Sequence, residues 1–216
     1  MSTRAPARDG VLLVAGLLGV LGNVVAVVLL ADQPAAYRLG GLDAWAQQIG
    51  EHRDATVASA AAFTIGLIAL AIWALALGRH LTSHAARAGV WITAIGAVGN
   101  AFGTLTPLVL ARHVASSGEA AQLVSRALLG VTLSLDALFN LTLGVGLLAI
   151  ATGLPSEITR GLRALAIAAG VASIPVCAQA VSDGAAKLLL ISGPLWLAFI
   201  TLTSLRRWRH DARAMG

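Results

Sequence analysis

The sequence predicts an all-α protein, a polytopic bundle of six transmembrane helices in a single domain covering residues 1–216. Composition is the first observation behind this prediction. Apolar residues make up 57% of the chain and charged residues only 12%, about half of the ~25% that is usual in soluble domains. The second is that the apolar residues form long runs without the period-2 alternation of outer-membrane strands. A chain of this size cannot hide so much apolar surface from water, so lipid is the expected solvent.

Six apolar runs mark the expected helices in order along the chain. A helix rises ~1.5 Å per residue, so about 20 residues cross a hydrocarbon core of ~30 Å. Five of the runs carry no charge, and the fourth is interrupted only by Asp136. Glycines and prolines inside the runs do not argue against helices, because membrane helices tolerate them. The expected spans are residues 10–31, 55–78, 88–111, 127–153, 164–182 and 188–205.

The basic residues predict the orientation of these spans, because cytoplasmic loops carry an excess of Arg and Lys. With the N-terminus inside, the inner segments hold Arg4, Arg8, Arg79, Arg87, Arg160, Arg163, Arg206, Arg207, Arg209 and Arg213. The outer segments then hold only Arg38, Arg53, Arg112, Arg126 and Lys187. We therefore expect both ends of the chain in the cytoplasm. The strong preference for Arg over Lys, with abundant Ala and Gly, favours a bacterial source and a multi-pass protein of the plasma (inner) membrane.

The long first loop contains a short amphipathic segment at residues 40–52. Leu42, Trp45 and Ile49 are spaced to share one helical face, and polar side chains occupy the others. This pattern predicts a helix lying on the outer interface with its apolar face in the lipid. A lid over a functional site is the alternative.

A glycine motif recurs in the first and third spans, as GVLGN at residues 19–23 and GAVGN at residues 96–100. An internal repeat would explain the match, and so would chance in a chain rich in Ala and Gly. Small residues let helix backbones approach closely in lipid. We therefore expect helix–helix contacts at Gly19, Gly22, Gly96 and Gly99.

Asp136 is the ionisable residue that needs an explanation, since a charge in the hydrocarbon costs ~2.5–3.5 kcal/mol on insertion scales. It lies about 15 Å along the helix from Arg126, near the expected midplane. Asn140 follows one turn later on the same face. Asn23 and Asn100 fall at a similar depth in their own spans, and Thr104 and Ser134 flank this level. The candidates for binding a ligand or carrying a proton are Asp136, Asn140, Asn23 and Asn100.

These polar residues have a structural and a functional interpretation. In the structural one, a protonated Asp136 and the asparagines hydrogen-bond across helices and fix the bundle. In the functional one, they bind a solute, a lipid headgroup or a proton. The convergence of four polar groups at one depth keeps the functional interpretation open.

Sequence signatures of catalysis and of cofactors are absent. The chain has no GxSxG, HExxH, P-loop or intramembrane DxxxD motif. His80 and His84 have no neighbouring carboxylate or cysteine to complete a metal site. We expect no metal and no cofactor, catalytic residues stay unassigned, and the lack of a basic–aromatic stripe argues against nucleic acid. The expected partners are the lipid bilayer and a small-molecule or lipid ligand, and a homo-oligomer is compatible with the sequence.

Two stretches carry a resemblance to a known group of proteins. One runs from Gly144-Val-Gly146 to Gly153-Leu-Pro155, and the other covers residues 193–199, GPLWLAF. With the basic N-terminal tip and the long first outer loop, the layout resembles a family of uncharacterised bacterial six-helix integral membrane proteins of the domain-of-unknown-function class. The resemblance covers most of the chain and implies the six-helix architecture. It implies no activity and no site.

The sequence therefore favours a multi-pass membrane protein whose midplane polar cluster binds or moves a small or amphiphilic molecule. A membrane-embedded enzyme that acts on a lipid or isoprenoid, with Asp136 as general acid, is the first alternative. A structural or assembly protein without a ligand is the second. A transporter requires water access to Asp136, an enzyme requires a lateral opening for a long chain, and an assembly protein requires a closed bundle.

Overall fold

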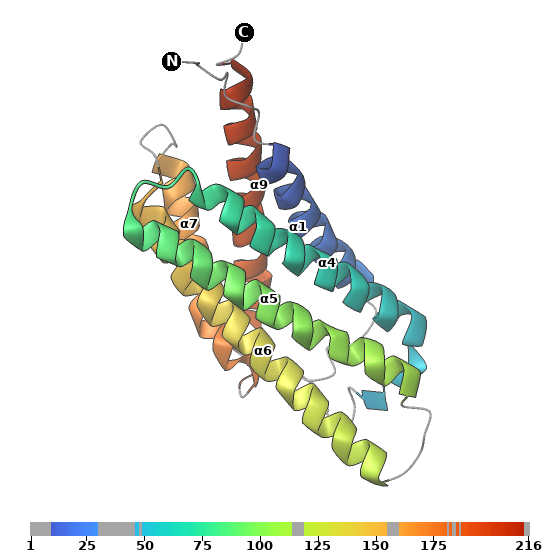
Figure 1. Cartoon of the computed structure of the whole chain (residues 1–216). Helices are drawn as coiled ribbons and strands as arrows, with labels where there is room; N and C mark the ends of the chain where they lie inside the picture. The colour runs from blue at the N-terminus through green and yellow to red at the C-terminus, as the bar shows by residue number, and fades with distance from the viewer. Residues whose placement is uncertain are drawn as a thin grey trace.

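The computed structural model describes residues 10–29, 46–47, 49–113, 119–154, 160–180, 182, 185 and 187–213. Within these ranges the chain is an all-α bundle, which confirms the predicted fold class (Figure 1). Six helical segments in the described part are long and apolar enough to cross a membrane. The elements are α1 (Gly10–Leu29), α4 (Arg53–Gly78), α5 (His84–His113), α6 (Glu119–Thr152), α7 (Arg160–Ser173), the 3-10 helix η1 (Ile174–Ala180) and α9 (Leu189–Arg213).

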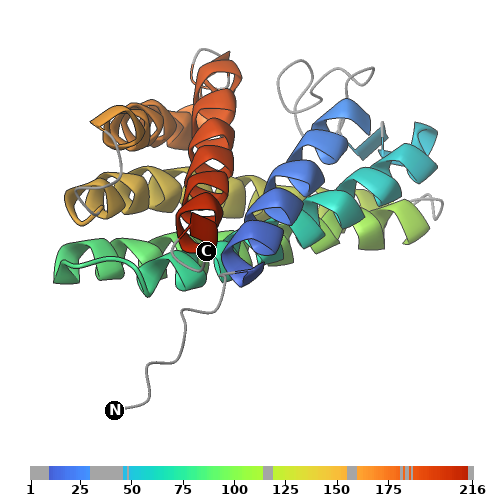
Figure 2. The same ribbon diagram turned by 90° about the horizontal axis from the view of Figure 1, so that it is seen from above.

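The helices form a closed ring in chain order. Each of α1, α4, α5, α6, α7 and α9 contacts the next, and α9 returns to contact α1. Figures 1 and 2 show α9 between α1 and α7, with α4, α5 and α6 on the other side of the bundle. Apart from the long first loop between α1 and α4, the connections are short and place consecutive helices beside one another in antiparallel pairs. The contact of the last helix with the first completes the ring.

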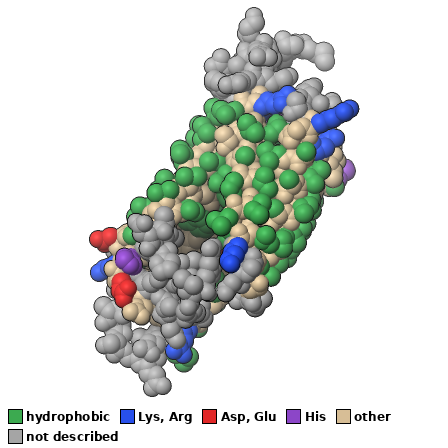
Figure 3. All heavy atoms as spheres, turned by 180° about the vertical axis from the view of Figure 1, so that it is seen from behind, with side chains coloured by type: hydrophobic (Ala, Val, Ile, Leu, Met, Phe, Trp, Pro, Cys, Tyr) green, Lys and Arg blue, Asp and Glu red, His purple; other side chains and the backbone are tan. Residues whose placement is uncertain are grey.

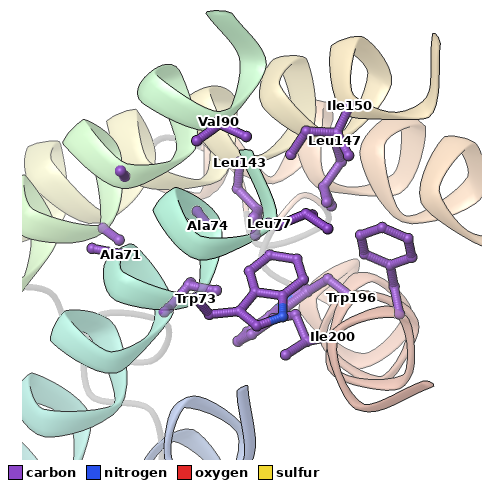
Figure 4. Close-up of a cluster of buried hydrophobic side chains, with 14 of the residues drawn as sticks. Ala71, Trp73, Ala74, Leu77, Val90, Leu143, Leu147, Ile150, Trp196 and Ile200 are labelled. Atoms are coloured by element: carbon purple, nitrogen blue, oxygen red, sulfur yellow. The ribbon is translucent and has the colours of Figure 1, made fainter. Parts of the chain in front are cut away.

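An apolar core fills the ring near the end where α4 ends and α5 begins. Trp73 of α4 and Phe199 of α9 meet edge to face, with ring centroids 6.0 Å apart and planes at 88°. Trp73 Nε1 also donates a hydrogen bond to Ser204 Oγ, at 3.0 Å. Leucine and isoleucine side chains from α4 and α6 pack around this pair (Figure 4). The core thus packs α4 and α6 against the C-terminal helix α9.

Glycines allow the closest helix contacts, as predicted at three of the four motif positions. A Cβ at Gly22 would lie 2.6 Å from Gly66 Cα, so α1 and α4 touch through their backbones. Gly19 lies in ordinary contact range of α4, and a Cβ at Gly96 would overlap Thr142 of α6. The prediction for Gly99 is wrong, because nothing lies within 4 Å of a Cβ placed there. Gly96 and Gly99 lie one turn apart on the same side of α5, but only Gly96 has an atom of a neighbouring helix, Thr142 of α6, in contact with the position of a Cβ.

The fifth span is not one straight α-helix. Helix α7 ends at Ser173, and η1 continues the span with 3-10 geometry. Pro175 has no N–H and cannot donate the i→i−4 bond of an α-helix. A 3-10 segment rises ~2.0 Å per residue against ~1.5 Å in an α-helix. The change of geometry sets both the height and the direction of the side chains after Pro175.

The predicted interfacial segment at residues 40–52 lies mostly outside the described residues, including Leu42 and Trp45. Ile49 is described, and the prediction that it faces lipid is wrong. It is buried together with Leu110 of α5 and Leu129 of α6. The ends of these two helices present apolar side chains toward each other, and Ile49 covers them. Its hydrophobic contact is therefore made with the protein.

The surface of the bundle supports a multi-pass membrane protein. Apolar side chains cover the middle of the face shown in Figure 3, and the visible charged side chains lie toward its two ends. Along α1 the exposed side chains are apolar throughout the described length, including Val14, Leu21 and Val28. An exposed apolar band of this extent is unfavourable in water and suits lipid.

Candidate functional site

Asp136 lies at the middle of α6, about 25 Å along the axis from either end of this helix. Its side chain is half-buried, on the side of α6 that meets α5 and η1. Leu133, Leu135 and Ala137 around it on the same helix are also half-buried apolar residues. The carboxyl group is therefore far from the polar ends of the helix, and Leu133, one turn before it on the same face, is apolar.

Two amide side chains from other elements hold the Asp136 carboxyl. Asn100 Nδ2 of α5 donates a hydrogen bond to Asp136 Oδ1, at 2.9 Å. Gln179 Nε2 of η1 donates to Asp136 Oδ2. Each carboxyl oxygen thus receives one amide donor, and three separate elements meet at one point. We call Asn100, Asp136 and Gln179 the Asp136 cluster.

Asn140 lies beside the cluster but uses its amide within α6. Its Nδ2 donates to the backbone oxygen of Asp136, at 2.8 Å. The side chain is buried and follows Asp136 by one turn. Asn140 therefore satisfies a backbone carbonyl of the helix that carries the cluster, and its Nδ2 is not directed at the carboxyl.

Asn23 occupies a different part of the bundle. Its Nδ2 donates to Gly19 O, at 2.7 Å, and a Cβ at Gly66 would lie 2.9 Å from that nitrogen. Asn23 therefore lies in the contact between α1 and α4, whereas the cluster is built by α5, α6 and η1. Equal depth in two helices does not bring two side chains together, because each also has to point toward the same neighbour.

The two flanking hydroxyl residues also separate. Thr104 lies one turn beyond Asn100, and its hydroxyl is 2.7 Å from that of Thr64 on α4. This pair extends the polar region from α5 toward α4. Ser134 is exposed, and its hydroxyl donates to Gly130 O of its own helix, at 2.9 Å. Ser134 does not contribute to the cluster.

Gln179 is the site residue that the sequence analysis missed. It is the amide residue within the expected span 164–182, which was a signal available in the sequence. Counted along a straight α-helix from Arg163, it falls close to the outer end of the span, away from Asp136. In the structure Gln179 nevertheless contacts Asp136 of α6. It lies in η1, whose three residues per turn give the side chains other directions than a continuous α-helix would.

The Gln179 side chain keeps one polar atom without a partner. Gln179 is only 5% exposed, and its Oε1 has no hydrogen-bond partner among the described residues. A buried acceptor left unpaired costs about 1–3 kcal/mol. Since Oε1 and Nε2 share one carbon atom, the unpaired oxygen lies beside the Asp136 carboxyl.

The cluster combines a carboxyl group with neutral donors and a free acceptor. Within the described residues, the side chains that interact with the Asp136 carboxyl are the two amides, and no cation contributes. The described residues also contain no group of three or more His, Cys, Asp or Glu side chains that could hold a metal. A carboxyl group in this setting can take up or release a proton, and it can accept hydrogen bonds from a bound molecule.

Comparisons of the chain with protein-family models, with curated proteins and with solved structures gave no match.

Proposed function

We propose that this protein binds a small or amphiphilic molecule with hydrogen-bond donors at the Asp136 cluster, as a transporter-like unit of a bacterial plasma membrane. One observation carries the proposal. A half-buried carboxyl group at the middle of a membrane-length helix is held by amides from two other elements, and the unpaired Gln179 Oε1 lies next to it. The predicted resemblance to uncharacterised bacterial six-helix membrane proteins is consistent with this proposal and adds no activity to it.

A ligand explains features that a purely structural cluster does not. A fully paired amide or an apolar contact would hold the helices together with a smaller loss of stability. Buried polar networks stabilise a fold only when every member has its hydrogen-bond partners. Here a carboxyl group is retained inside a span and a buried acceptor stays unpaired. Other buried polar atoms among the described residues are also unpaired, such as Asn23 Oδ1 and Thr93 Oγ1. Gln179 Oε1 differs from them because its side chain also donates to the Asp136 carboxyl. A bound molecule with hydrogen-bond donors would pair with the carboxyl group and with Gln179 Oε1.

Binding is also favoured over catalysis. An enzyme with Asp136 as general acid needs further groups that stabilise the reacting atoms or supply a nucleophile. In the described part of the chain, the side chains in contact with the carboxyl are the amides of Asn100 and Gln179. These groups orient the carboxyl and suit recognition of a ligand.

We expect an octyl probe with a donor headgroup to bind the cluster. The full chain in lipid nanodiscs would be titrated with octylamine, octanol and octanoate, with the thermal unfolding midpoint as the readout. A ligand at 100 times its Kd stabilises the folded state by about 2.7 kcal/mol. The midpoint should rise in a saturable way with octylamine, octanol or both, and octanoate should have no effect.

Two variants make this titration specific to the cluster. Gln179→Met keeps the side-chain volume and removes the free acceptor, so it should weaken the saturable shift. Ser134→Ala alters a polar residue of α6 that faces away from the cluster, and it should leave the shift unchanged. A shift that Gln179→Met does not alter, or the absence of any saturable shift, would show that the cluster does not bind such molecules.

The proposed orientation, with both ends in the cytoplasm, has its own test. His52 and Thr82 are exposed residues at opposite ends of α4. In a Cys177→Ser background, we expect a membrane-impermeant maleimide to label His52→Cys from the periplasmic side. Thr82→Cys should label only after the membrane is opened. Labelling of both positions from one side would contradict the spanning of α4, and the reverse pattern would contradict the orientation.

A further inference from the structure

We infer that the Asp136 cluster selects an organic cation with N–H groups, an amine in its ammonium form, and that this cation competes with a proton for the Asp136 carboxyl. The inference rests on the proposed function and specifies the ligand class of the same site. Three properties of the cluster carry it: the balance of charge, the set of free acceptors and the apolar surroundings.

The charge balance requires a positive partner for an ionised Asp136. The two groups that hold the carboxyl are neutral amides, which donate hydrogen bonds and leave the net charge uncompensated. An isolated carboxylate in an apolar environment is strongly unfavourable, so a proton or a cation must neutralise it. In the inferred site a proton would do so when no ligand is bound, and a bound ammonium group would do so in its place.

The titratable side chains on the elements that pack against α6 lie mostly at their ends. Among the side chains that the structure describes, α5 carries His84 and Arg87, α7 carries Arg160 and Arg163, and α6 itself carries Arg126. On η1 the titratable group is the thiol of Cys177. The nearest charged residue along α6 is Arg126, about 15 Å away. In this part of the chain, Asp136 is therefore the group whose titration would govern binding at the cluster.

The acceptors match an ammonium group. After each carboxyl oxygen has accepted one amide donor, both oxygens keep a lone pair. Gln179 Oε1 adds a further acceptor beside them. An ammonium group has three N–H donors and a positive charge, so it satisfies the carboxylate and the amide oxygen together. A hydroxyl group offers one donor and no charge, and a carboxylate ligand would be repelled.

A metal ion suits this arrangement less well than an amine. Calcium takes six to eight oxygen ligands, and magnesium demands a near-octahedral set. The cluster supplies one carboxylate and one free amide oxygen. The half-buried Leu133, one turn before Asp136 on the same face of α6, would contact the hydrocarbon part of an amphiphilic amine. The expected ligand is therefore an amine with an apolar body.

Competition with a proton fixes the sign of the pH dependence. When an ammonium group binds to protein whose Asp136 is protonated, the carboxyl releases its proton and the N–H groups take its place. Below the pKa of this carboxyl, the apparent Kd should therefore rise tenfold for each unit that the pH falls. Above that pKa the Kd should be constant. An alkylamine of Lys-like pKa, about 10.4, stays charged throughout this range, so its own ionisation does not contribute.

The test uses the full chain in nanodiscs, with octylamine as the probe and octanol as the neutral comparison. Apparent Kd values would be measured from pH 4 to pH 9, and proton release on binding would be followed with an indicator dye in weak buffer. We expect tighter binding of octylamine than of octanol, a tenfold change in Kd per pH unit at low pH, and release of about one proton per bound amine there. The infrared C=O band of a protonated carboxylic acid should decrease as octylamine binds.

Asp136→Asn is the decisive variant, because it preserves the shape of the side chain and removes the titratable proton. It should abolish the pH dependence, the proton release and the infrared change, while Ser134→Ala should retain all three. If octylamine and octanol bind equally well and neither binding depends on pH, the cation inference is wrong and the proposed function stands. If no octyl probe binds in a saturable way, both are wrong.

Discussion

Replacement of Asp136 by Leu is expected to lower the free energy of unfolding, whereas Asp136→Asn should remain close to the parent. Leu would leave Asn100 Nδ2 and Gln179 Nε2 without the acceptors they now contact. A buried donor without a partner costs about 1–3 kcal/mol, and Asp136→Leu would leave two such donors. Asn retains one acceptor oxygen and a similar shape, so most of the cluster can persist.

The stability of these variants would be measured by thermal and denaturant unfolding in one defined lipid–detergent mixture. Ser134→Leu is the matched control, because it also places Leu on α6, at an exposed position two residues from Asp136. We expect this control to be as stable as the parent. If Asp136→Leu were equally stable, the carboxyl would not hold α5 and η1 against α6. If Asp136→Asn bound octylamine with the parent's pH dependence, Asp136 would not be the titrating group.

Gly22→Ala is expected to destabilise the bundle by about 1–3 kcal/mol, the usual cost of overpacking. The added Cβ would lie 2.6 Å from Gly66 Cα and 2.6 Å from Ala62 O. Both are backbone atoms of α4, so the clash cannot be relieved by rotation of a side chain. Helices α1 and α4 would have to separate, and the buried hydrogen bond from Ser59 Oγ to Ala26 O, at 3.0 Å, would weaken with them.

Gly99→Ala supplies the control from within the same motif. Nothing lies within 4 Å of a Cβ at Gly99, so no contact opposes the substitution. Because Ala is favoured over Gly in a helix interior by about 1 kcal/mol, Gly99→Ala should be neutral or stabilising. Unfolding midpoints of both variants, measured in the same mixture, test the difference. Equal effects of the two substitutions would contradict the close contact of α1 with α4.

The sequence was sufficient to predict the six helices. A backbone in lipid must satisfy its hydrogen bonds internally, so apolar runs of about 20 residues become helices regardless of their neighbours. The rise per residue is also fixed by this bonding, which is why the depth of Asp136 and Asn100 could be estimated by counting. Their hydrogen bond in the structure agrees with that estimate of depth.

The tertiary structure decided which of the side chains at one depth meet. Asn23 and Asn100 are the last residues of the two copies of the five-residue motif. Asn23 lies against α4, whereas Asn100 donates to Asp136. Gly22 and Gly99 hold the same place in that motif, and only Gly22 contacts a neighbouring helix. The direction of a side chain depends on how each helix is rotated and which helix lies beside it. That choice results from packing along the entire length of two helices, which a short motif does not encode.

Gln179 shows, within one span, the same difference between what the sequence predicts and what helix packing decides. The apolar run that contains it predicted a membrane crossing, and the described residues Arg160–Gln179 are long and apolar enough for one. Its position on α6 depends on η1, whose 3-10 geometry begins next to Pro175. A proline excludes one hydrogen bond, but whether the chain then kinks, continues as an α-helix or tightens to a 3-10 helix is decided by the helices around it. The sequence by itself thus determined the number, the approximate extent and the depth of the helices, because local hydrogen bonding sets these. The partners of Asp136 were decided only by the packing of α5, α6 and η1.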